Sequence, residues 1–195
     1  MTVTSGDPRT VVRDLVAGIA PYDDHEAQDR AATLEWVRSG APLFRTAPPA
    51  TPDRHLCVYF VLFDEARRSI FLVDHVKAGL WLPPGGHVDV DEDPRDTALR
   101  EAAEELRIDG DFHSRFGDNP LFLTVTRTRG DHSHTDVTFW FVFAADQDTN
   151  IDLDTREAKE ARWFDIDDLE QWAQGRFDPH MARFAHKLSS AAPAS

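Results

Sequence analysis

The segment Gly85–Ile108 reads GGHVDVDEDPRDTALREAAEELRI and carries the most ordered pattern of charges in the chain. Asp93 is a suitable N-cap residue, and Pro94 fits the first position of a helix. Asp96 adds the negative charge that is favoured in a first turn. We therefore predict a helix from about Pro94 to Leu106.

Three glutamates share one face of this predicted helix. Glu101, Glu104 and Glu105 stand at positions i, i+3 and i+4, so they repel one another, and they lie near the helix C-terminus, where the macrodipole disfavours anions. A solvated acidic face is one interpretation. Hard cations such as Mg²⁺ prefer several carboxylate oxygens, so the spacing favours a metal site. The residues predicted to dock on a core are Leu99, Ala102, Ala103 and Leu106.

The same residues resemble the Nudix box, G-x5-E-x7-R-E-U-x-E-E-x-G-U, where U is aliphatic. The matching positions are Gly86, Glu92, Arg100, Glu101, Ala102, Glu104, Glu105 and Ile108. Arg107 stands where the family has its second glycine, which normally lets the chain leave the helix with positive φ. Because arginine adopts positive φ only at a cost, we expect the helix to continue to Gly110. On such a helix Arg107 would point away from the glutamate face, and the less favoured alternative is that Arg107 reaches into the cleft and contacts a substrate phosphate.

The resemblance implies a hydrolase that cleaves a diphosphate bond of a nucleoside diphosphate linked to another group, X, with Mg²⁺ or Mn²⁺ as cofactor. A diphosphate repels an anionic nucleophile, so such catalysis depends on positioning and charge neutralisation. By resemblance Glu104 and Glu105 bind the metal. Glu101 would be a third ligand or a residue that organises the metal site. The carbonyl of Gly85 would be a further ligand. Arg100 would hold the carboxylates in place.

The residue that activates water stays open at this point. Crowded carboxylates raise one another's pKa while a metal lowers it, so the sequence does not identify the proton acceptor. Many family members supply another acid from a loop before a tryptophan-containing strand. Glu157, six residues before Trp163, matches that placement and is predicted to be a ligand or base. The alternative is that Glu157 and Glu160 form an ordinary charged loop.

A second group of candidates follows the box. His132, His134 and Asp136 alternate, so on a strand they would share one face. They would contact substrate or a second metal, or they would be solvated imidazoles near a loop. Lys77, close to the glycine turn, would meet a phosphate or remain in solvent.

Composition limits the partners. The 195 residues include 35 acids and 21 lysines and arginines, a net charge of −14, which disfavours duplex nucleic acid as a partner. Cys57 is the only cysteine, so no internal disulfide forms and a cytoplasmic setting is expected. We see neither a signal peptide nor an apolar run long enough to span a membrane. The expected partner is a small nucleotide or diphosphate.

The whole chain predicts an α/β protein with the Nudix fold, an α/β/α sandwich around a mixed sheet. Residues 1–50 would form an N-terminal helical hairpin and linker, and residues 51–190 the hydrolase domain with two C-terminal helices. The hairpin would pack on the main domain or mediate a homodimer, and a lid over the substrate is the less favoured alternative. In its second helix, from Asp23 to Gly40, the residues predicted to face inward are Ala27, Ala31, Leu34 and Val37. The predicted strands are 55–63, 70–73, 121–128, 135–144 and 161–164, and the last helices are 167–174 and 179–189.

Two other functions are compatible with this fold. One is a Nudix-like nucleotide-binding or sensor module without turnover, which usually lacks some of the box carboxylates. The other is an isoprenoid diphosphate isomerase, which needs a reactive cysteine. Glu101, Glu104 and Glu105 are all present, and Cys57 lies inside an apolar strand, so the hydrolase is favoured.

Overall fold

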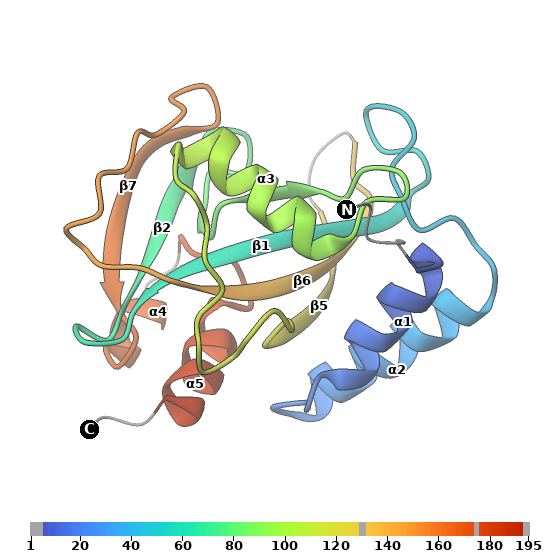
Figure 1. Ribbon diagram of the computed structural model, residues 1–195, viewed down its shortest axis with the longest axis horizontal. Helices are drawn as coiled ribbons and strands as arrows, with labels where there is room; N and C mark the ends of the chain where they lie inside the picture. The colour runs from blue at the N-terminus through green and yellow to red at the C-terminus, as the bar shows by residue number, and fades with distance from the viewer. Residues whose placement is uncertain (1–5, 129–131, 174–175, 193–195) are drawn as a thin grey trace.

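The computed structural model describes residues 6–128, 132–173 and 176–192. The strands are β1 (Arg54–Asp64), β2 (Ser69–His75), β3 (Trp81–Leu82), β4 (Gly85–His87), β5 (Phe122–Arg127), β6 (Thr135–Ala144) and β7 (Ala158–Asp165). The helices are α1 (Pro8–Gly18), α2 (Asp24–Arg38), α3 (Pro94–Leu106), α4 (Leu169–Ala173) and α5 (Met181–Ala191). Helix α3 covers one face of the sheet and α5 the other, while α1 and α2 lie together beside β5 (Figure 1). The predicted α/β fold with an N-terminal helical hairpin is confirmed.

The sheet is mixed, as predicted. Its main path is β3-β2-β1-β6-β5, with β4 paired to β1 and β7 paired to β2. Strands β1 and β6 run parallel, and the other pairs are antiparallel. The apolar run of β1 is buried on both faces, as expected for a central strand. The short strands β3 and β4 were not predicted.

The core has two halves, one on each face of the sheet. Alternate residues of β1 divide between them, with Phe60 in the half under α3 and Val61 in the half under α5. In α3, Ala98, Ala102 and Leu106 are fully buried. The prediction that Ala103 docks on the core is wrong, because this residue faces solvent and Ala98 takes the inward position one turn before Ala102.

The predicted extension of α3 to Gly110 is also wrong. The helix ends at Leu106, and Arg107 takes the left-handed conformation with φ 55° and ψ 37°, donating its backbone N–H to the carbonyl of Ala102. Gly110 does not end the helix but allows close packing, because a Cβ there would overlap the ring of Phe143. The chain leaves the helix at residue 107, and the following segment packs closely on β6.

The N-terminal hairpin packs on the edge of the sheet. Val37 faces inward as predicted, but Ala27 and Ala31 are exposed, and the buried positions are Glu26, Asp29 and Thr33 instead. The periodicity of apolar residues could not predict which positions of α2 are buried, because the buried residues of this helix are mostly polar. None of the helices in the described ranges is long and apolar enough to cross a membrane.

The buried acids of α2 complete the hydrogen bonding of the edge strand β5. The Glu26 carboxylate accepts from the backbone N–H of Leu123 at 3.2 Å, and Asp29 accepts from that of Val125 at 3.2 Å. An edge strand leaves alternate N–H groups without a sheet partner, so these carboxylates replace a missing strand. Lys187 of α5 neutralises Glu26, with Nζ 2.8 Å from its Oε1.

Candidate active site

The glutamate face of α3 opens into a cavity of about 600 Å³. Strand β4 forms one wall, and the segment that precedes β7 forms another. Two kinds of charged side chain line it. The acids include Glu101, Glu104, Glu105, Asp154 and Glu157, and the bases are Arg45, Lys77, Arg100, Arg107 and Arg156. Three predicted ligands, a predicted fourth acid and several cations thus share one space, although the acids and bases come from distant parts of the sequence.

Two glycines let β4 lie directly under the glutamates. Gly85 has φ 153°, and a Cβ there would overlap the carbonyl oxygen of Val58 in β1. A Cβ on Gly86 would overlap the carboxylate of Glu101. The N–H of Gly85 donates to Glu105 Oε1 at 3.2 Å, so the backbone of β4 is in contact with the acidic face.

Arg100 organises the acidic face. Its Nε and Nη2 donate to the two oxygens of Glu92, each at 3.0 Å, and Nη1 donates to Glu101 Oε1 at 2.8 Å. Nη1 also lies 3.3 Å from Glu104 Oε2. Glu92 in turn accepts from the Thr97 hydroxyl at 2.7 Å. A planar guanidinium that contacts three carboxylates restricts their rotamers.

The three glutamates differ in environment. Burial, followed by the charge of Glu101, raises the pKa of Glu105 to about 8. Burial also raises the pKa of Glu101, while the Glu104 side chain is 59% exposed. Two partly buried carboxyl groups that oppose each other's ionisation are an unfavourable arrangement without a cation. The donor set, all oxygen, fits a hard divalent metal.

Glu157 also lines the cavity. Its carboxylate lies 3.4 Å from Lys77 Nζ and 3.9 Å from His75 Nε2, and its charge contributes to the raised pKa of Glu105. Lys77 therefore meets a carboxylate, and its side chain is 75% exposed. Glu160 instead pairs with Arg162 on the protein surface. Of the two acids in this segment, Glu157 is the one placed at the cavity.

Sequence reasoning missed several residues that line the cavity. Arg107 was expected to point away from the glutamates, but the left-handed conformation redirects its side chain into the cavity lining. Asp154 and Arg156 belong to an irregular segment without a recognisable pattern. Asp154 is joined to the end of α3 by its N–H, which donates to the carbonyl of Glu105 at 2.8 Å. A second bond, from the N–H of Asp152 to the carbonyl of Leu106 at 3.1 Å, joins the same segment to the end of α3, and such tertiary contacts are not visible in the sequence.

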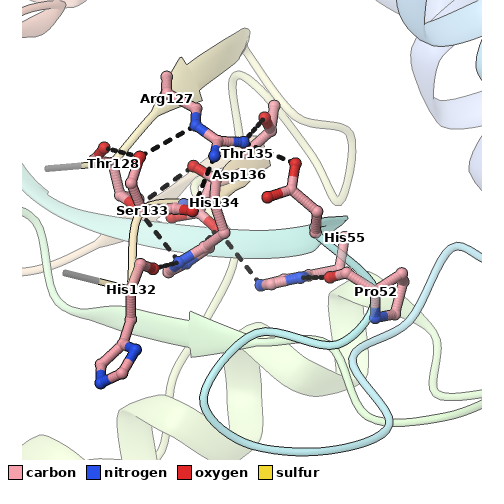
Figure 2. A network of polar contacts seen from close by, with 10 residues as sticks. Pro52, His55, Arg127, Thr128, His132, Ser133, His134, Thr135 and Asp136 are labelled. Carbon is pink, nitrogen blue, oxygen red and sulfur yellow. Dashed lines mark hydrogen bonds and ion pairs between the residues drawn. The ribbon is translucent and has the colours of Figure 1, made fainter. Parts of the chain in front are cut away.

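A second polar group lies beside the cavity. His134 and Asp136 are side by side, as their alternation predicted, with His134 Nε2 3.1 Å from Asp136 Oδ1. His132 is exposed, and its ring points away from them (Figure 2). His55 and His87, which were not predicted, complete the group. Residues 129–131 of the predicted loop lie outside the described residues.

Comparisons with known proteins point to one family. The sequence model of the NUDIX domain matches residues 53–188. An uncharacterised Nudix hydrolase of Bacillus subtilis, YvcI, is 28% identical over 124 residues, which are 61% of this chain and 72% of that protein. A probable DHNTP pyrophosphohydrolase of Lactococcus lactis is 28% identical over 100 residues, 49% of this chain and 57% of that protein.

Solved structures share the fold. The NUDIX domain of Shewanella oneidensis NrtR, complexed with ADP ribose, superposes with a TM-score of 0.54 at 20% identity, covering 74% of this chain and 92% of that one. At this identity the likeness shows the architecture alone. The neighbour's ligand is a property of that protein.

Proposed function

Since the chain belongs to the Nudix family, we propose that it is a metal-dependent hydrolase that cleaves the diphosphate bond of a nucleoside diphosphate linked to a group X. The observation that carries this proposal is the intact carboxylate face, Glu101, Glu104 and Glu105, held by Arg100 at the wall of a cavity. A module that only binds nucleotides has no need of this repulsive cluster. Hydrolase and pyrophosphohydrolase relatives support the general class.

Glu101, Glu104, Glu105 and the carbonyl of Gly85 are the proposed ligands of Mg²⁺ or Mn²⁺. When bound, the cation would neutralise charge on the diphosphate oxygens and favour ionised carboxylates. The raised pKa values of Glu101 and Glu105 are consistent with a site built to hold positive charge. Arg100 fixes the geometry of the ligands through its bonds to Glu92 and Glu101.

The remaining cavity residues suggest how substrate is held. Glu157 is the proposed fourth carboxylate, and it binds metal or accepts the proton of the attacking water. Arg45, Arg107 and Arg156 are the cavity-wall cations proposed to contact phosphate groups, and Arg156 is also paired with Asp154. They place positive charge beside the acids of the cavity in a protein whose net charge is −14.

We also propose that residues 51–190 are the hydrolase domain and residues 1–50 an extension attached to the β5 edge. Among the described residues, none of α1 or α2 lines the cavity, which supports a packing role over that of a lid. A homodimer through the N-terminal hairpin is a further proposal, and a cytoplasmic location and the absence of duplex nucleic acid as a partner are proposals from composition. Cys57 is buried, and burial raises the pKa of its thiol, which disfavours the isomerase alternative.

The test is a screen of diphosphate compounds with Mg²⁺ and Mn²⁺. The panel includes nucleoside triphosphates, nucleotide sugars, ADP-ribose, dinucleoside polyphosphates, coenzyme A and dihydroneopterin triphosphate, with phosphate or nucleotide release as readout. On the best substrate, Glu104→Gln and Glu105→Gln should each lower kcat/KM by at least roughly a hundredfold, about 2.7 kcal/mol of transition-state stabilisation. Glu160→Gln, an acid outside the cavity, is the matched control and should keep full activity.

Metal binding gives an independent readout. A hundredfold excess over Kd should stabilise the protein by about 2.7 kcal/mol, and Glu104→Gln should lose most of the resulting shift in Tm. Release of no product, together with tight binding of a nucleotide, would favour the sensor module over the hydrolase. Full activity in both glutamine variants would contradict the assigned ligands.

A further inference from the structure

Three imidazoles and one carboxylate converge beside the cavity, in a group separate from the glutamates of α3. The four residues are His55 in β1, His87 at the end of β4, His134 just before β6, and Asp136 in β6. Each offers one ligand atom, and these atoms lie within 4.8 Å of one another. The His55 ring centroid is 5.0 Å from those of both His87 and His134.

The sheet brings these residues together. His55 and Asp136 are directly paired in the parallel register of β1 and β6. His87 is paired with Cys57 in the antiparallel register of β4 and β1, so its cross-strand partner stands two residues along β1 from His55. Because residues i and i+2 of a strand point to the same face, His55 and His87 share one side of the sheet.

Backbone carbonyls fix the tautomers of two of the rings. His55 Nδ1 is 2.8 Å from the carbonyl oxygen of Pro52, and His134 Nδ1 is 2.8 Å from that of His132 (Figure 2). A carbonyl only accepts, so each Nδ1 carries the proton and each Nε2 presents a lone pair. This is the arrangement that orients metal-binding histidines in proteins.

The Nε2 lone pairs of His55 and His134 face the lone pairs of the Asp136 carboxylate. Asp136 Oδ1 lies 3.4 Å from His55 Nε2 and 3.1 Å from His134 Nε2, and a carboxylate oxygen also only accepts. Both His55 Nε2 and Asp136 Oδ1 are buried and have no hydrogen-bond partner among the described residues. Three acceptors facing one another repel unless a cation lies between them. The His55 side chain is fully buried.

We propose that His55, His87, His134 and Asp136 bind one Zn²⁺ ion as a closed, four-coordinate structural site. Imidazole nitrogens with one carboxylate suit zinc, whereas Mg²⁺ prefers oxygen ligands only. Zinc bonds of about 2.0–2.1 Å in a tetrahedron place ligand atoms about 3.3 Å apart. The two nitrogen–oxygen separations, 3.1 and 3.4 Å, already match that spacing.

Such an ion would connect three strands at the edge of the cavity. His87 immediately follows Gly85 and Gly86, and its carbonyl accepts from Arg100 Nη2 at 3.4 Å. The zinc site would therefore hold β4 against β1 and β6, next to the glycines that contact the glutamates. The inference does not depend on the proposed hydrolysis, because it concerns a different ligand set and is tested by binding.

The experiment measures zinc binding to the full chain. Protein treated with a chelator is dialysed against Zn²⁺ and its metal content determined, and affinity is measured by competition. The wild type should bind one equivalent at this site, and the double variant Glu104→Gln/Glu105→Gln should retain it. Asp136→Asn and His134→Ala should each weaken binding by more than about a hundredfold, beyond the 10–100-fold typical of an outer-shell change. His132→Ala, from the same loop, is the matched control and should bind like the wild type.

Three results would overturn the proposal: no zinc bound by the wild type, loss of the ion in the double glutamate variant, or unchanged affinity in His134→Ala and Asp136→Asn. Circular dichroism checks that the variants fold. If they do not, Co²⁺ substitution in the wild type decides the matter. Intense visible bands of tetrahedral Co²⁺ would support the site, and weak bands of octahedral Co²⁺, or none, would refute it.

Discussion

Replacing Arg107 by glycine tests how α3 ends. The residue adopts φ 55° and ψ 37°, a conformation that disfavours every side chain with a Cβ. Among the described residues its side chain forms no ion pair or hydrogen bond, and its electrostatic partner is Asp154. The substitution therefore removes backbone strain and only a weak interaction at the surface. We expect Arg107→Gly to stabilise the protein.

The magnitude follows from two opposing effects. Left-handed geometry at a residue other than glycine costs about 1–2 kcal/mol, which Arg107→Gly relieves. Glycine also increases the conformational entropy of the unfolded chain, which opposes folding by about 0.4–1 kcal/mol. The net gain should be about 1 kcal/mol, a rise of roughly 2–4 °C in Tm for a chain of this size.

Urea unfolding of Arg107→Gly and Arg107→Ala separates backbone from side chain. Alanine removes the same side chain but keeps the strain, so the glycine variant should exceed the alanine variant by about 1 kcal/mol in unfolding free energy. Equal stability of the two variants, or a less stable glycine variant, would refute the assigned conformation. The kinetics of the same proteins report on the cavity: a large rise in KM in both would mean that the Arg107 side chain binds substrate.

Two further predictions concern buried charges away from the cavity. Burial raises the pKa of Asp178 to about 6, above its unfolded value of 3.8, so its contribution to stability is fully present below pH 3.8 and is lost as pH rises through 6. Asp178→Asn should therefore gain up to about 3 kcal/mol relative to the wild type between pH 4 and 7, and a constant difference in urea unfolding across that range would contradict the shift. Lys187→Met should lose about 3–5 kcal/mol because it leaves the Glu26 carboxylate buried without its cation. The double variant Glu26→Gln/Lys187→Met should recover a substantial part of that loss, and equal losses in single and double variants would argue against a charge effect.

The structural features that could be predicted from the sequence depend on local chemistry. Asp93 and Pro94 start α3 where their preferences place it, and the glutamate face follows from helical spacing. The apolar run of β1 is buried as its composition indicates. The strands and the mixed sheet follow from such runs and the turns between them. Each of these features depends on residues that are close in sequence.

What the sequence could not predict depends on partners far along the chain. Arg107 is in the left-handed region, and three residues later Gly110 packs against the distant Phe143. Glu26 and Asp29 are buried, against their usual preference, because the edge of β5 offers them N–H groups. Helix propensity and hydrophobic periodicity contain no information on either partner.

The candidate zinc site shows the same limit in the functional residues. The alternation of His134 and Asp136 could be recognised, but His55 joins them only through the parallel register of β1 and β6. That register is fixed by the fold as a whole. The site therefore could not be assembled from the sequence around any one of its members.

Several carboxylates in the described part of the chain are paired with a cation, whereas two groups beside the cavity contain side chains that are not. Glu92 has Arg100 and Glu26 has Lys187, each within 3.0 Å. In the described part of the chain, no basic side chain forms an ion pair with Glu105. Since folding stability alone favours paired buried charges, sites that lack a cation point to function.

Both groups with unpaired side chains meet at β4. The backbone of Gly85 and Gly86 contacts the glutamates, and the next residue, His87, belongs to the imidazole group. One three-residue strand thus separates an all-oxygen ligand set from a set rich in nitrogen. The two sets differ in the metal they favour, so the hard cation expected for diphosphate chemistry and a zinc ion could be bound side by side without exchanging places.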